Sequence, residues 1–198
     1  MKVLRIAFVL AAALFAASCL PVTTDAPVGT TAGRGADPAL IGTWKAVPEK
    51  PNQGGPQFVH FIAGKDGAMT VLLVDTGKRR SDGEWSVSSA SAAVLGGRHY
   101  LNVRALSENG KPAEGADAER NVPLLYRFDD DGTLRVFLID EDKAKAAIEA
   151  GTIEGRIEPG DYGDVILTAP PAKLDALIAG DDGAALFTQK LLVLRRVE

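Results

Sequence analysis

The chain has 198 residues, of which 22 are lysine or arginine and 26 are aspartate or glutamate, so its formal net charge at pH 7 is -4. A nucleic-acid-binding domain needs a basic stripe, and this acidic balance argues against that class of function. The only cysteine, Cys19, excludes a disulfide within the chain. The length corresponds to one domain that is large enough to bury a core.

The first 18 residues have the three parts of an export signal. Lys2 and Arg5 precede an apolar run over residues 6–17, and small residues end that run. The run is too short for a comfortable membrane-spanning helix, which needs about 20 residues. We therefore expect residues 1–18 to be a signal peptide, and an uncleaved anchor is the alternative. Cleavage would remove Lys2 and Arg5 and leave a more acidic chain.

The motif Ala16-Ala17-Ser18-Cys19 resembles the lipobox of bacterial lipoproteins, although Ala16 stands where that family usually has leucine. The resemblance implies that the Cys19 thiol receives a diacylglyceryl group and the freed amine a third acyl chain. One acyl chain holds a protein to a membrane only marginally, whereas two or three make release slow. Leu20, where an inner-membrane lipoprotein of enteric bacteria has aspartate, implies the outer membrane, facing the periplasm. An ordinary signal peptide cut near this point is the alternative.

Residues 19–38 are predicted to be the lipidated cysteine and a flexible tether. The stretch after Cys19 contains three prolines and three glycines but few large apolar residues, so it cannot bury enough surface to fold. As a flexible coil it would span about 25 Å. Residues 39–198 are predicted to form a single β-rich globular domain, which the tether would hold clear of the membrane head groups.

Alternating apolar residues predict a mainly antiparallel β domain, barrel-like or a strongly curved sheet, with two short inserted helices. Gly64-Lys65-Asp66-Gly67 and Asp129-Asp130-Asp131-Gly132 are typical of hairpin turns. The expected helices are residues 141–150 and 170–179, and residues 107–121 are expected to be a mobile loop. The expected strands are residues 41–47, 58–63, 69–75, 84–88, 98–106, 122–128, 133–139 and 189–197.

Gly42-Thr43-Trp44, at the start of the first expected strand, resembles the Gly-x-Trp motif of lipocalins. In that family the tryptophan closes one end of the barrel and an arginine late in the last strand packs across it. The resemblance implies that Arg195 or Arg196 contacts Trp44 through a cation–π interaction. The chain departs from the family because its expected helices precede the last strand. A plain core tryptophan is the alternative. The Gly-Thr-Trp start, the expected helix segment at residues 138–151 and the Leu-Val-Leu-Arg-Arg end together also resemble a recurrent type of uncharacterised bacterial lipoprotein. No known activity comes with that resemblance.

The sequence carries no pattern that is typical of catalysis or metal binding. His60 and His99 each fall within an expected strand, where a buried or rim position is the ordinary explanation. There is no Gly-x-Ser-x-Gly elbow, no closely spaced histidine pair and no phosphate-binding glycine loop before a helix. The acidic clusters at Asp129, Asp140 and Asp181 lack the spacing of a calcium loop and suit turns and helix caps. We therefore expect no catalytic residue, metal or cofactor.

Two functions of different classes are consistent with these patterns, and an enzyme is a distant third. The first is an envelope lipoprotein that binds a small apolar molecule inside the barrel. The second is a non-catalytic accessory lipoprotein that contacts another envelope protein through its outer face or residues 107–121. The alternation of the strands leaves open which face is the inner one. The residues that we predict to line the ligand are Phe58, Ile62, Val71, Leu73, Trp85, Leu101, Val103 and Tyr126.

Overall fold

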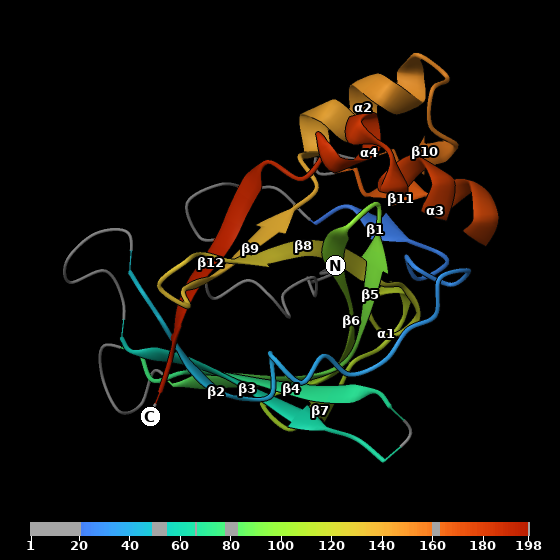
Figure 1. Ribbon diagram of the computed structural model, residues 1–198. Helices are drawn as coiled ribbons and strands as arrows, with labels where there is room; N and C mark the ends of the chain where they lie inside the picture. Colours follow the sequence, from blue (N-terminus) through green and yellow to red (C-terminus); the bar gives the residue numbers. More distant parts are fainter. Residues whose placement is uncertain (1–20, 49–54, 66, 78–82, 160–162, 198) are drawn as a thin grey trace, which may run out of the picture.

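A computed structural model describes residues 21–48, 55–65, 67–77, 83–159 and 163–197 of the chain (Figure 1). The predicted signal peptide and Cys19 lie outside these residues. In the described part of the chain, no helix has the length and apolar character needed to cross a membrane. Two substructures are present: a β-barrel, and a smaller unit of short strands and helices packed on its outer wall, which we call the cap.

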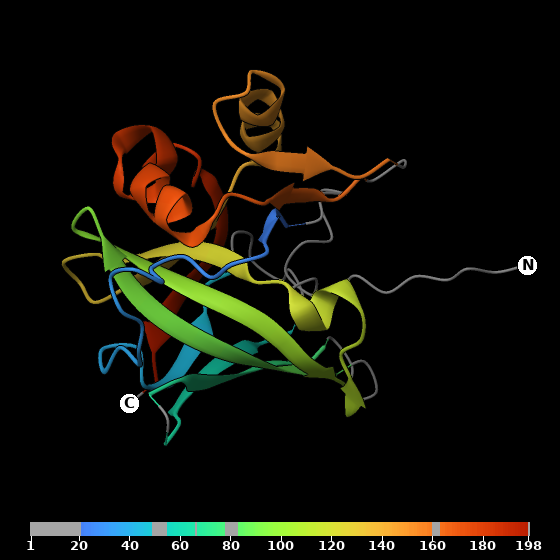
Figure 2. The same ribbon diagram turned by 90° about the vertical axis from the view of Figure 1, so that its right-hand side faces the viewer.

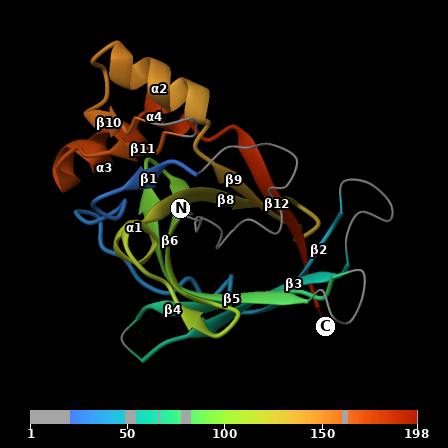
Figure 3. The same cartoon turned by 180° about the vertical axis from the view of Figure 1, so that it is seen from behind.

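Eight antiparallel strands of the described chain form a closed barrel. Their spatial order is β5, β4, β3, β2, β12, β9, β8, β6, and pairing of β5 with β6 closes the ring. Figure 3 shows this ring with the cap outside it. The prediction of a barrel-like, mainly β domain is therefore confirmed. The strands are β2 (Gly42–Ala46), β3 (Gln57–Ala63), β4 (Met69–Asp75), β5 (Glu84–Leu95), β6 (Arg98–Glu108), β8 (Val122–Phe128), β9 (Leu134–Leu138) and β12 (Gln189–Arg196).

Strand β5 is much longer than the predicted residues 84–88. Its second half consists mainly of serine and alanine, which carry little strand signal by themselves. Pairing with β6 along its whole length makes this half a strand, with a register shift between Val87 and Ser88. Residues 107–121, predicted to be a mobile loop, contain instead the end of β6, the short strand β7 (Lys111–Pro112) and the helix α1 (Ala116–Glu119).

The cap combines a three-stranded sheet with three helices. Strand β11 (Val165–Leu167) lies between β10 (Gly155–Ile157) and β1 (Thr23–Thr24), and β1 runs parallel to it. The two predicted helices are present as α2 (Glu141–Glu149) and α3 (Pro171–Ala179), and α4 (Asp181–Ala184) follows them. The Asp140 side chain caps α2 by accepting a hydrogen bond from the Lys143 amide. The cap core packs on outward-facing residues of the barrel, such as Tyr100, Leu125 and Phe137.

The prediction of a flexible tether is wrong for residues 21–38. Val22 and Val28 are buried in the cap core, and β1 is part of the cap sheet. The segment is held by two buried polar side chains that are distant in sequence. Asn102 accepts a hydrogen bond from the Val28 amide at 2.6 Å and donates one to the Val28 carbonyl at 2.8 Å.

The second of these side chains is Asp175, in helix α3. It accepts hydrogen bonds from the Gly29 amide at 2.6 Å, the Thr31 amide at 2.7 Å and the Thr31 hydroxyl at 2.6 Å. Gly29 has a φ of +87°, and an added Cβ would lie 2.1 Å from the Cβ of Ala93, so only glycine fits this close approach. Side chains of the barrel and the cap thus provide hydrogen-bond partners for the backbone of this N-terminal segment, which could not fold alone.

The strand directions define two ends of the barrel (Figure 2). The starts of β2, β4, β6 and β9 and the ends of the other four strands form one end, which we call the tryptophan end. The opposite end, which we call the loop end, carries α1 and β7. The N-terminal segment crosses the outer wall between them: Thr24 pairs with Asn121 next to β8, and Gly35 pairs with Ala92 near the end of β5.

Candidate functional site

The inner face of the barrel is almost entirely apolar. Strand registers place one continuous set of side chains on this face; for example, Val59 pairs with Leu73, and Leu73 pairs with Ser86. The buried members of this set form the barrel core: Trp44, Val59, Phe61, Met69, Ala90, Leu101, Val103, Leu124, Tyr126, Leu134, Val136, Leu138 and Leu194. Such a wall offers dispersion contacts to an apolar molecule and few polar partners.

The structure brings five of the eight predicted lining residues to the inner face. These are Val71, Leu73, Leu101, Val103 and Tyr126. The prediction was wrong for Phe58, Ile62 and Trp85, which lie on the outer face; Ile62 is 52% exposed and Trp85 is 41% exposed. Alternation gives the period of a strand but not which of its faces is inner, and the apolar residues of β3 occur on both.

Trp44 closes the tryptophan end. Its side chain is 1% exposed, and its indole Nε1–H donates to the Leu40 carbonyl at 2.7 Å. The Arg196 guanidinium lies over the indole, with its Cζ 4.4 Å from the ring centroid. The expected cation–π contact is therefore made by Arg196 and not by Arg195, whose guanidinium instead lies 3.7 Å from Asp131 on the surface. The two arginines point to opposite faces of β12 because side chains alternate along a strand.

Arg196 also fixes the segment before β2. Its two terminal nitrogens donate to the Ile41 carbonyl at 2.7 Å and the Ala39 carbonyl at 2.5 Å. Gly42 has a φ of +133°, and an added Cβ would lie 2.6 Å from the nearer of these nitrogens. The glycine of the Gly-x-Trp motif is thus favoured by its backbone conformation, and a larger residue would also displace the Arg196 guanidinium.

A polar contact inside an aromatic cluster completes the closure of this end. The Tyr126 hydroxyl donates to Asp37 Oδ2 at 2.6 Å, and the His99 ring packs 5.5 Å from the Tyr126 ring. Burial, then the hydrogen bond and the charge of Asp37, raise the pKa of Tyr126 far above its usual range. Tyr126 therefore stays protonated and holds the 36–41 segment in place. Asp37 and Phe128, whose ring lies 6.0 Å from that of Trp44, were missed by the sequence reasoning.

The two histidines do not share a site. His99 is on the inner face of β6 at the tryptophan end, and its Nδ1 lies 3.9 Å from Asp37 Oδ2. His60 is on the outer face of β3, where its Nδ1 lies 2.9 Å from the Thr43 hydroxyl. They lie on opposite faces of the sheet, so they do not form one catalytic pair.

The inner wall carries partly exposed residues at both ends. At the loop end, four apolar inner-face residues are only partly buried: Ala46, Leu73, Val122 and Leu192. The neighbouring inner positions Ser86, Ser88 and Ala105 carry small side chains. Ser88 is 5% exposed. At the rim, Gln57 donates to Asp75 Oδ2 at 2.7 Å. At the tryptophan end, Phe128 is 39% exposed and the His99 side chain is 50% exposed.

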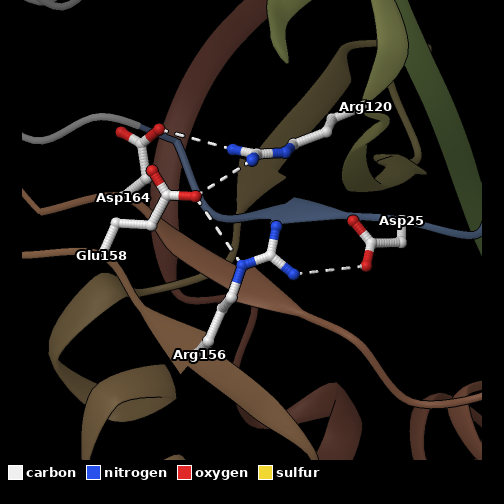
Figure 4. Close-up of polar contacts among 5 residues, drawn as sticks. All are labelled: Asp25, Arg120, Arg156, Glu158 and Asp164. Carbon is white, nitrogen blue, oxygen red and sulfur yellow. Dashed lines mark hydrogen bonds and ion pairs between the residues drawn. The ribbon is translucent and has the colours of Figure 1, made fainter.

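A network of charged residues joins the N-terminal segment to the cap (Figure 4). Arg120 pairs with Glu158 at 3.1 Å and with Asp164 at 3.4 Å. Arg156 pairs with Glu158 at 3.7 Å and with Asp25 at 3.6 Å. Because each guanidinium already faces two carboxylates, this network is not an anion-binding site. Its ion pairs are largely solvent-accessible, and each contributes little to stability. We interpret the network as a set of ion pairs that together help to hold β1 against the cap.

The acidic clusters serve turns, caps and ion pairs. Asp129 pairs with Arg135 at 2.6 Å, and Asp181 pairs with Arg98. Hydrogen bonds from Thr133 hold the pKa of Asp131 below its usual value. No group of three or more potential metal ligands occurs among the residues that the structure describes.

Comparisons with protein-family models, with curated proteins and with solved structures found no match for this chain. The assignment of a function therefore depends on the geometry of the barrel and on the N-terminal motif.

Proposed function

We propose that this protein is a lipid-anchored protein of the bacterial cell envelope that binds a small apolar molecule inside its barrel. An eight-stranded barrel is either filled by its own side chains or holds one small ligand. The observation that carries the proposal is a closed barrel with an apolar inner wall that is not fully covered by the protein itself. Trp44 is buried at one end, and Ala46, Leu73, Val122 and Leu192 are only partly buried toward the other.

The proposed ligand enters at the loop end and lies against the partly exposed wall. Apolar contacts with Leu73, Val122 and Leu192 would supply most of the affinity, at about 25 cal/mol for each Å² of apolar surface buried. The hydroxyl of Ser88, on the inner face of β5, would orient a polar group of the ligand, such as a hydroxyl or a carbonyl. We infer an elongated, mainly aliphatic molecule, because this part of the wall is apolar and the carboxylates at inner-face positions, Asp75 and Glu84, lie at the rim.

A matched pair of substitutions in β5 tests this binding. Ser88 faces inward and Ser89, the next residue, faces outward. A fluorescent fatty-acid analogue is titrated into the C19S chain and its S88L and S89L derivatives. We expect saturable binding that is weakened at least tenfold by S88L and unchanged by S89L. Thermal unfolding of each variant shows whether the fold is intact. Absence of saturable binding to the C19S chain, or equal effects of the two leucines, refutes the proposal.

The anchor is tested separately at Cys19. Because two or three acyl chains make release slow, we expect the unaltered protein to remain with membranes after washing at high salt. The C19S variant should appear as soluble or precursor protein with unchanged unfolding temperature. Mass spectrometry of the N-terminal peptide reads out the acyl groups directly. Membrane retention of C19S, or a bare thiol on the unaltered protein, contradicts a lipid anchor.

A second candidate function is the non-catalytic accessory role. It is favoured by two exposed apolar residues on the outer wall at the loop end, Trp85 and Leu106. The W85S/L106S variant tests it, and the matched control is V94S, which alters an exposed apolar residue at the tryptophan end. A protein partner that copurifies with the unaltered chain and with V94S, but not with W85S/L106S, supports this role.

A further inference from the structure

The point at which the chain enters the folded domain sets how an N-terminal anchor would orient it. Val22 is buried, and Thr24 pairs with Asn121 immediately before β8 begins. The start of β8 belongs to the loop end. From there the segment runs toward the tryptophan end, past Asn102 and Ala92. The chain therefore enters at the loop end of the barrel, where Leu73 and Val122 on the inner wall are partly exposed.

The covalent link between Cys19 and this entry point is very short. Three residue steps separate Cys19 from Val22, and a fully extended chain covers at most about 11 Å in three steps. The longest barrel strand, β5, has 12 residues, and at about 3.3 Å per residue and the usual tilt of barrel strands the barrel is roughly 30 Å tall. An anchor at Cys19 thus reaches the loop end easily, while the tryptophan end lies more than twice as far away.

We propose that the loop end of the barrel rests on the membrane surface, so that its partly exposed inner wall opens toward the bilayer. This inference depends on the proposed lipid anchor, and it identifies the ligand source as the bilayer itself. An acyl chain would pass from the membrane into the barrel without crossing bulk water. The helix α1 and strand β7 protrude at the same end and would be the elements nearest the head groups (Figure 2).

The charges near the entry point indicate that this contact is not electrostatic. Arg120 and Arg156 are occupied by Glu158, Asp164 and Asp25 (Figure 4), so they are not free to bind anionic head groups. The contact should therefore not weaken as the salt concentration rises, unlike the binding of a basic patch to anionic lipid. The orientation follows from the length of the link.

Two exposed lysines in hairpins form a matched pair for the test. Lys111 lies in β7 at the loop end, and Lys65 lies in the β3–β4 hairpin at the tryptophan end. In an acylated chain, K111C or K65C provides the only free thiol, because Cys19 is blocked. Each is labelled with a fluorophore, and the protein is reconstituted into vesicles whose head groups carry a nitroxide quencher. We expect quenching of the Lys111 position to be at least threefold stronger than that of the Lys65 position, at low and high salt.

A 20-residue Gly/Ser spacer inserted between Leu20 and Pro21 is the control for the link. The protein should stay on the membrane while the difference in quenching disappears. Equal or reversed quenching without the spacer overturns the orientation and leaves the anchor intact. If the difference in quenching persists with the spacer, the short link between Cys19 and Val22 is not what orients the barrel. Two labels on each chain would show that the Cys19 thiol is free. Together with a lack of membrane retention, this result overturns the anchor and the orientation that depends on it.

Discussion

The strongest test of the structure is the removal of the Asp175 carboxylate. This side chain, 3% exposed, connects helix α3 to the N-terminal segment by accepting three hydrogen bonds. The D175A variant leaves the buried Gly29 amide without an acceptor, which costs about 1–3 kcal/mol. Thr31 is exposed, so water can replace the two bonds from it, and their loss adds about 1 kcal/mol in total. We expect a destabilisation of about 2–4 kcal/mol.

Urea unfolding gives the change in global stability, and amide hydrogen exchange gives the local effect. Exchange should accelerate most at Val28, Gly29 and Thr31, because the segment detaches from the wall before the barrel opens. D130A, at an exposed position of the β8–β9 turn, is the control and should change stability by less than about 0.5 kcal/mol. If D175A behaves like D130A, or if exchange at these amides is already unprotected in the unaltered protein, the packed N-terminal segment is refuted.

A double-mutant cycle sharpens this test. Asn102 holds Val28 through two hydrogen bonds of its own, so N102A should release the same segment. Once the first substitution has released the segment, the second substitution removes few further stabilising interactions. The combined effect of D175A and N102A should therefore be smaller than the sum of the single effects. Strict additivity would show that the two side chains act on separate parts of the structure.

Two further predictions concern the tryptophan end. The R196A variant loses the contact with Trp44 and the hydrogen bonds to the Ala39 and Ile41 carbonyls, so its unfolding free energy should fall by about 1–2 kcal/mol. R195A loses only a surface ion pair and should lower the unfolding free energy by less than about 0.5 kcal/mol. Urea titrations of both variants measure these changes. Burial, and then the hydrogen bond to Asp37, raise the pKa of Tyr126 in the folded state, so its contribution to stability is complete below pH 10 and is lost as the pH rises above 10. Y126F should therefore unfold with a flatter alkaline dependence, and an unchanged slope between pH 9 and 11 would contradict the burial of a protonated Tyr126.

Local patterns predicted much of the barrel but not its faces. Strand β4, strand β8 and the β8–β9 turn were expected with their observed bounds or nearly so, because alternation and Asp-Gly turns are local signals. The inward position of Val71 and the outward position of Trp85 were not decided locally. They depend on which face the neighbouring strands cover, and that is set by the register of the closed ring.

The N-terminal segment shows even more clearly the difference between what local sequence patterns predict and what tertiary contacts decide. By itself the sequence predicted a β-rich domain and a late arginine packed on Trp44, which the structure confirms. It also predicted an export signal and an acylated Cys19, and these stay predictions. Only the tertiary structure decided that residues 21–38 are ordered and where they enter the barrel. The reason is physical: the hydrogen-bond partners that stabilise this segment, Asn102 and Asp175, lie 74 and 146 residues away from it in the chain. A composition too poor in apolar residues to fold alone becomes ordered when distant side chains satisfy its backbone.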